Sequence, residues 1–113
     1  MIYIIKILIA LIALEHLFIL WVEIFAWNTI GRKLFTSLDQ SLFDKTKVLA
    51  ANQGLYNGFL AAGLIWSLVI SSNTWSYYIS VFFLGCVIIA GIYGALTATK
   101  SIFLNKHSPH LWH

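Results

Sequence analysis

Three long apolar stretches dominate the pattern of the chain and predict three long helices. They cover residues 2–27, 48–70 and 75–98, and each exceeds the roughly 20 residues needed to cross the hydrocarbon core of a bilayer. The first stretch continues to Trp27 with no small-residue cleavage site after it, so we interpret it as a membrane span and not as a signal peptide. The pattern predicts an all-α fold: an integral membrane helical bundle forming one transmembrane domain over residues 1–113.

The connection between the first two stretches, residues 28–47, has its own periodic pattern. Apolar side chains recur there at helical spacing, at Leu34, Phe35, Leu38 and Leu42. Ser37 followed by Gln40 resembles a capping box, which marks the start of a helix. A short amphipathic helix on the membrane surface fits this pattern. A segment that merely joins two spans is the alternative.

The tail, residues 99–113, differs from the three apolar stretches in length and polarity. It reads SIFLNKHSPHLWH from Ser101 and is too short and too polar to cross a bilayer by itself. We expect it to lie along the membrane interface or to form a short, truncated fourth helix.

Composition and charge support a membrane protein and give its orientation. Hydrophobic residues make up 60% of the chain and charged residues only 10%, whereas about a quarter of the residues of a soluble domain are charged. The net charge is +3, and the basic residues lie outside the apolar stretches except for Lys6 near the start of the first, which indicates topology and not nucleic-acid binding. Positive residues favour the cytoplasmic side of the cell (inner) membrane. Residues 28–47 and 99–106 are therefore predicted inside, and the N-terminus outside.

Polar and ionisable residues lie within the apolar stretches, where each needs a partner because burial in lipid is costly. They are Glu15, His16 and Glu23 in the first stretch, Asn52, Gln53, Tyr56 and Asn57 in the second, and Tyr93 in the third. Counting from the cytoplasmic ends puts Glu23 level with Asn52 and Gln53, and it puts His16 deeper, level with Asn57. These matching heights predict a polar pocket inside the membrane that faces the cytoplasm.

The chemistry of this pocket has several interpretations. Glu15, His16 and Glu23 are candidate catalytic acids or bases, and the amides of the second stretch would orient a ligand. A polar network that only fixes helix register is an alternative, and a proton-handling site is another. Imidazole and carboxylate can bind a metal, but no motif such as HExxH is present, so we predict no metal site. No nucleophile motif, phosphate loop or cofactor fingerprint identifies a reaction or a cofactor.

Small residues at helical spacing predict close helix packing. Gly54 and Gly58 form a GxxxG motif in the second stretch, and such seams let helices approach closely. Three spans enclose a site poorly, so we expect a homo-oligomer in the lipid bilayer. The favoured function is binding of a small polar or amphiphilic molecule. The alternatives are an oligomeric small transporter or proton relay, and a non-catalytic accessory membrane subunit.

Four ordered blocks of the sequence resemble a known family. They are ALEHLFILWVEIFAW, GRKLF, LAANQGLYNGFLAAGLIW and FFLGCVIIAGIYGALT. The blocks resemble the DUF1304 family of small bacterial membrane proteins, a domain of unknown function, over the chain to about residue 103. The resemblance implies four spans, and some members are labelled epimerase. It also implies that the polar residues named above are the characteristic positions. The sequence NKHSPHLWH stands where a fourth apolar span is expected.

Overall fold

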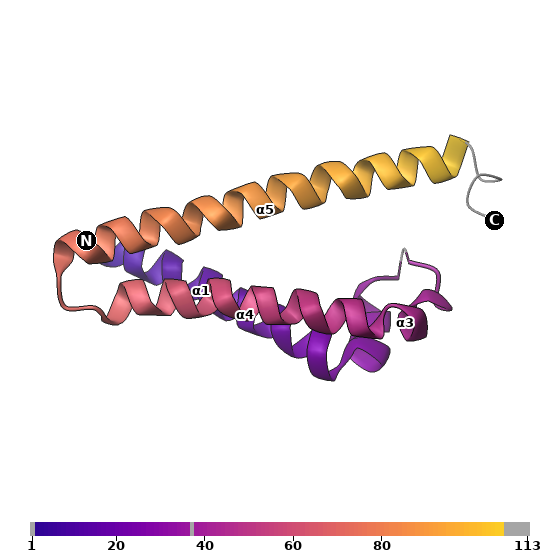
Figure 1. Cartoon of the computed structure of the whole chain (residues 1–113), viewed down its shortest axis with the longest axis horizontal. Coiled ribbons are helices and arrows are strands. Elements are labelled where there is room, and N and C mark those ends of the chain that lie inside the picture. The colour runs from indigo at the N-terminus through magenta and orange to yellow at the C-terminus, as the bar shows by residue number, and fades with distance from the viewer. Residues whose placement is uncertain (1, 37, 108–113) are drawn as a thin grey trace. The chain divides into compact units, whose positions relative to one another are not determined.

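The computed structural model describes residues 2–36 and 38–107, and every regular element in this part of the chain is helical (Figure 1). The elements are α1 (Tyr3–Phe25), the π-helix η1 (Trp27–Gly31), α2 (Arg32–Leu34), α3 (Leu42–Lys45), α4 (Lys47–Val69) and α5 (Asn73–His107). The prediction of an all-α fold is confirmed. The chain divides into two compact units, Met1–Phe83 and Leu84–His113, and the boundary falls within α5.

Two of the long helices are long and apolar enough to cross a membrane. Within the described residues these are α1, Tyr3–Phe25, and the part of α5 from Asn73 to Thr97. Helix α4 has 23 residues, the same length as α1, but Asn52, Gln53 and Asn57 lower its hydropathy. Length and composition therefore identify two candidate spans where the sequence pattern predicted three.

Helices α1 and α4 pack against each other in antiparallel directions, and two glycines of α4 allow their close approach. A Cβ atom on Gly54 would lie 2.7 Å from Cγ1 of Ile24 and 3.2 Å from the carbonyl oxygen of Leu20. A Cβ atom on Gly58 would lie 2.6 Å from Cδ1 of Leu20. Later residues of α4 therefore contact earlier residues of α1, as in an antiparallel pair. The predicted GxxxG seam is confirmed as the contact surface between these helices.

A short turn, residues 70–72, joins α4 to the beginning of α5 within the first unit. The hydroxyl of Ser72 accepts a hydrogen bond from the backbone N–H of Trp75 at 3.3 Å, which caps the start of α5. The hydroxyl of Ser76 donates to the carbonyl oxygen of Ser67 at 2.6 Å, joining the two helices. Further along, the ring of Phe83 occupies the space where a side chain on Gly63 would lie. The hydroxyls of Ser72 and Ser76 thus stabilise the turn.

Helix α5 is longer than the pattern predicted. It continues past residue 98 to His107, so residues 99–107 extend α5 and do not form a separate fourth helix. The reason is local: no glycine or proline interrupts the chain between Gly94 and Pro109, and these are the residues that most strongly end helices. Residues 108–113, the rest of the predicted tail, lie outside the described part.

The connection between α1 and α4 also differs from the prediction. The prediction of one helix through Leu34, Leu38 and Leu42 is wrong, because α2 ends at Leu34 and α3 begins only at Leu42. The carboxylate of Asp39 accepts hydrogen bonds from the backbone N–H of Ser41 at 3.0 Å and from its hydroxyl at 2.9 Å. Such local bonds favour a turn over a helix. Ser37 of the predicted capping box lies outside the described residues.

Adding a methyl group at the seam should separate α1 from α4. We expect Gly54→Ala to lower the free energy of unfolding by about 1–3 kcal/mol, because the new Cβ atom crowds the backbone of α1 at Leu20. Gly58→Ala should lower it less, because the new Cβ atom meets only Cδ1 of Leu20, which can move. Thermal unfolding in mild detergent, followed by circular dichroism, measures this change. Gly91→Ala is the matched control, because a Cβ atom there meets no atom within 4 Å. Equal stability of all three variants would contradict the packing described.

Candidate functional site

One polar contact joins α1 to α4 inside the first unit. The side-chain amide of Asn57 donates a hydrogen bond to Oε1 of Glu23 at 2.7 Å. The same amide nitrogen donates to the backbone carbonyl of Gln53 at 3.0 Å, so both of its hydrogens are used. The two side chains are partly buried. The structure thus brings together one acid and one amide of the predicted pocket.

The heights assigned from sequence to these residues agree with the structure to within about one turn of α4. A Cβ atom on Gly54 would lie 3.1 Å from Cβ of Glu23, so Glu23 lies beside the position that follows Gln53. Its carboxylate bonds to Asn57, which the sequence placed one turn deeper.

An apolar recess lies beside this contact. It has a volume of about 190 Å³, and its lining residues are Phe18, Ile19, Val22, Glu23, Leu34 and Phe35. Its accessible wall is carbon, so Glu23 contributes the aliphatic part of its side chain. The recess therefore suits an apolar group, with the polar contact at its edge, and it differs from the wholly polar pocket that the sequence predicted.

His16 is buried on α1 but makes a contact within its own helix. Its Nδ1 lies 2.8 Å from the carbonyl oxygen of Ile12. Because a carbonyl oxygen only accepts, Nδ1 carries the proton, and a neutral ring then keeps Nε2 as its acceptor. Glu23 is seven residues further along α1, a rise of about 10 Å. The two groups are too far apart along the helix to exchange a proton directly.

The other predicted site residues make no hydrogen bond to Glu23 among the residues that the structure describes. Glu15, Asn52, Gln53 and Tyr56 are exposed on α1 and α4. Tyr93 is exposed and belongs to the second unit, whereas the contact and recess described above consist of first-unit residues. No three His, Cys, Asp or Glu side chains cluster in residues 2–36 and 38–97, whose side chains the structure describes.

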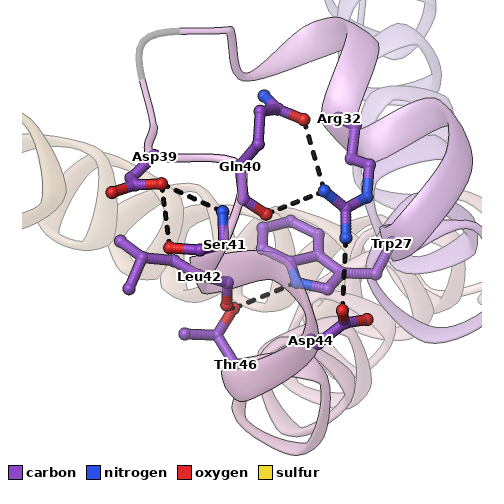
Figure 2. A network of polar contacts seen from close by, with 8 residues as sticks. All are labelled: Trp27, Arg32, Asp39, Gln40, Ser41, Leu42, Asp44 and Thr46. Carbon is purple, nitrogen blue, oxygen red and sulfur yellow. Dashed lines mark hydrogen bonds and ion pairs between the residues drawn. The ribbon is translucent and has the colours of Figure 1, made fainter.

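Sequence reasoning missed an aromatic cluster that closes the end of the α1–α4 pair. The ring of Trp27 packs against Phe35 at 5.6 Å and against Phe43 at 4.9 Å between centroids. Its indole N–H donates to the hydroxyl of Thr46 at 3.1 Å (Figure 2). Since Phe35 also lines the recess, this cluster supports one wall of it. The three aromatic residues are evenly spaced in the sequence, but the segment that carries them is not one helix, so this spacing alone did not predict their contact.

Arg32 contacts several residues of the connection between α1 and α4. Its guanidinium lies over the ring of Phe43, 5.1 Å from the centroid, and 3.6 Å from the carboxylate of Asp44. It also donates to the backbone carbonyl of Gln40 at 2.7 Å (Figure 2). Stacking on an aromatic ring while forking toward oxygen acceptors is a geometry that suits arginine better than lysine.

Two other polar groups of the connection have distinct environments. The hydrogen bonds from the backbone and hydroxyl of Ser41 lower the pKa of Asp39, so this exposed carboxylate is ionised at neutral pH. On η1, Oδ1 of Asn28 is buried and has no hydrogen-bond partner among the described residues. A π-helix is rare and often lies at a functional site, so Asn28 joins the candidate residues although no motif pointed to it.

Fold and site together define a small all-helical protein with two helices apolar enough to cross a membrane and a polar contact between α1 and α4. The chain belongs to the family described as Protein of unknown function (DUF1304), whose sequence model matches residues 10–111. This confirms the resemblance seen in the four sequence blocks. The chain is also 32% identical over 98 residues to the "Uncharacterized protein YpaA" of Lactococcus lactis subsp. lactis (strain IL1403). That alignment covers 85% of this chain and 81% of the relative. No solved structure matches the chain.

The bond between Glu23 and Asn57 predicts that the two side chains are coupled energetically. A double-mutant cycle with Glu23→Ala and Asn57→Ala should give an interaction free energy of about 0.5–1.5 kcal/mol, the range found for side-chain hydrogen bonds between membrane helices. Unfolding in detergent measures each stability. The control cycle pairs Glu23→Ala with Asn52→Ala, an exposed amide of the same helix, and should give none. A similar value in both cycles would contradict a specific bond.

The aromatic cluster predicts that Phe43 stabilises the whole connection. Phe43 is fully buried, so Phe43→Ala should lower the free energy of unfolding by about 3–5 kcal/mol. Neighbouring Leu42 is exposed, and Leu42→Ala should cost less than about 1 kcal/mol. Chemical unfolding followed by tryptophan fluorescence compares the two variants. A loss at Leu42 as large as that at Phe43 would contradict the assignment of the core.

Proposed function

We propose that the chain is an integral membrane protein whose helices α1, α4 and α5 all span the bilayer, and that it binds a small amphiphilic molecule beside Glu23. The observation that carries this proposal is the hydrogen bond from Asn57 to Glu23 at the edge of an apolar recess. Membrane insertion and ligand binding are supported separately, and each has its own test.

The exposure of the apolar helices supports insertion in a membrane. Only 22% of the apolar window of α1 and 11% of that of α5 are buried inside the chain. The core helix of a soluble protein would be mostly buried, because water disfavours contiguous exposed apolar surface. Lipid is the solvent that accepts such helices. Packing of α1 along Gly54 and Gly58 also argues against a signal sequence that is removed.

Helix α4 is the third proposed span despite its lower hydropathy. It lies antiparallel to α1 with the same number of residues, a length of about 35 Å for each helix. A helix packed along a span lies at the same depth as that span. The bond between Asn57 and Glu23 reduces the cost of burying one of its amides and the carboxylate. Basic residues in 28–47 and 99–106 favour the cytoplasm for these segments and the outside for the N-terminus.

An amphiphile matches the chemistry beside Glu23. The recess of about 190 Å³ has a carbon wall for an aliphatic group, and the carboxylate of Glu23 at its edge can accept a hydrogen bond from a polar group. Asn52 and Gln53 are exposed on the same helix. Because bare amides are costly in lipid, a second copy of the chain would cover them in a homo-oligomer.

Replacing the carboxylate tests the ligand proposal. We expect native mass spectrometry of the protein in mild detergent to show a stoichiometric added mass on the wild-type chain. Glu23→Gln should lose that mass, because the amide has a similar shape but no charge. Glu15→Gln is the control, since Glu15 is exposed and lies outside the recess. Retention of the same mass by the Glu23 variant, or a bare wild-type protein, would overturn ligand binding.

Cysteine labelling tests the membrane proposal independently of ligand binding. Cysteine reporters at Ser71 and at Ser41, in a chain with Cys86→Ser, should react from opposite sides of sealed inner-membrane vesicles with a reagent that does not cross lipid. Labelling at both sites from the same side would overturn three spans, whatever the ligand result.

A further inference from the structure

The connection between α1 and α4 carries a surplus of positive charge that the internal contacts leave exposed. Its basic residues, with the first residue of α4, are Arg32, Lys33, Lys45 and Lys47, and its acidic residues are Asp39 and Asp44. Arg32 lies 3.6 Å from Asp44 and is directed into the connection. Lys33, Lys45 and Lys47 are exposed. Apart from the Arg32–Asp44 pair, the segment therefore has three lysines and one acid, Asp39.

Apolar side chains are exposed next to these lysines. Leu34, Leu38 and Leu42 have between 39% and 51% of their surface accessible, although none belongs to a long apolar helix. Leu34 directly follows Lys33, and Val48 directly follows Lys47. Water disfavours such leucines, whereas the boundary between lipid headgroups and acyl chains accepts both the leucines and the ammonium groups.

The position and rigidity of the segment favour a membrane surface as its partner. Residues 26–36 and 38–46 lie at one end of the α1–α4 pair, where a spanning pair would meet the headgroups (Figure 1). Phe43 is buried between Trp27 and Arg32, so the backbone that carries the lysines is held in place. The exposed lysines thus need no large rearrangement to meet a ligand.

We propose that this segment is a binding surface for anionic phospholipid headgroups, with Lys33, Lys45 and Lys47 pairing with phosphate and Leu34, Leu38 and Leu42 entering the acyl boundary. Charge complementarity identifies the occupant, because a lysine cluster flanked by apolar side chains matches an anionic lipid surface. The inference rests on the proposed membrane topology and not on the ligand beside Glu23.

Native mass spectrometry with two lipids tests the surface. The detergent-solubilised full chain is mixed with equal amounts of phosphatidylglycerol and phosphatidylcholine that have the same acyl chains. We expect the apparent affinity for phosphatidylglycerol to be roughly tenfold higher, since each lysine near an anionic lipid adds to the attraction. The variant with Lys33→Gln, Lys45→Gln and Lys47→Gln should retain both lipids equally. Lys6→Gln, near the start of α1, is the control and should keep the preference.

Two further readouts keep the outcomes distinct. Circular dichroism should show the same melting temperature for the triple variant and the wild-type chain in neutral detergent, because the lysine side chains are exposed. Equal retention of the two lipids by the wild-type chain, or an unchanged preference in the folded triple variant, would overturn the lipid surface. An acidic protein that co-purifies through the three lysines, in place of lipid, would also overturn it. None of these results depends on whether Glu23 retains a ligand.

Discussion

The close approach of α1 and α4 is the contact on which the rest of the first unit depends. At Gly54 the backbone of α4 lies so near α1 that a Cβ atom would crowd the carbonyl oxygen of Leu20. This distance lets the short side chain of Asn57 reach Glu23. It also fixes the distance between the end of α1 and the start of α4, which the connection must bridge. Glycine is required here for its lack of volume, because neither residue has a positive φ angle.

The first unit combines two kinds of packing at its ends. Near the turn between α4 and α5, small residues and hydroxyls predominate, with Ser67, Ser76 and Ser80 buried. At the opposite end, large rings and a guanidinium fill the space around Phe43. Small side chains allow close packing near the turn, and the aromatic cluster fills the space at the opposite end. This arrangement places the recess at the aromatic end, beside Phe35.

Much of the fold could be predicted from the sequence, because long apolar stretches and small-residue spacing act locally. The three long helices and the Gly54–Gly58 seam followed from those patterns. The connection did not, since the turn at Asp39 and the ring contacts of Trp27 depend on side chains that meet only after folding. The height of Glu23 beside Gly54 followed from counting along the helices, but its bond to Asn57 did not, because the side chain extends along α4 from its own Cβ.

The short turn after α4 has a consequence for how the chain would enter a bilayer during its synthesis. Helix α4 is polar enough that a translocation channel would release it to lipid reluctantly. Only residues 70–72 separate it from α5, the helix that follows, and the bond from Ser76 to Ser67 joins the two. A hairpin with so short a loop can partition as one body, so that the apolar helix offsets the cost of the polar one. Lengthening this loop would make α4 dependent on its own hydrophobicity, and the topology of newly made chains would then become mixed.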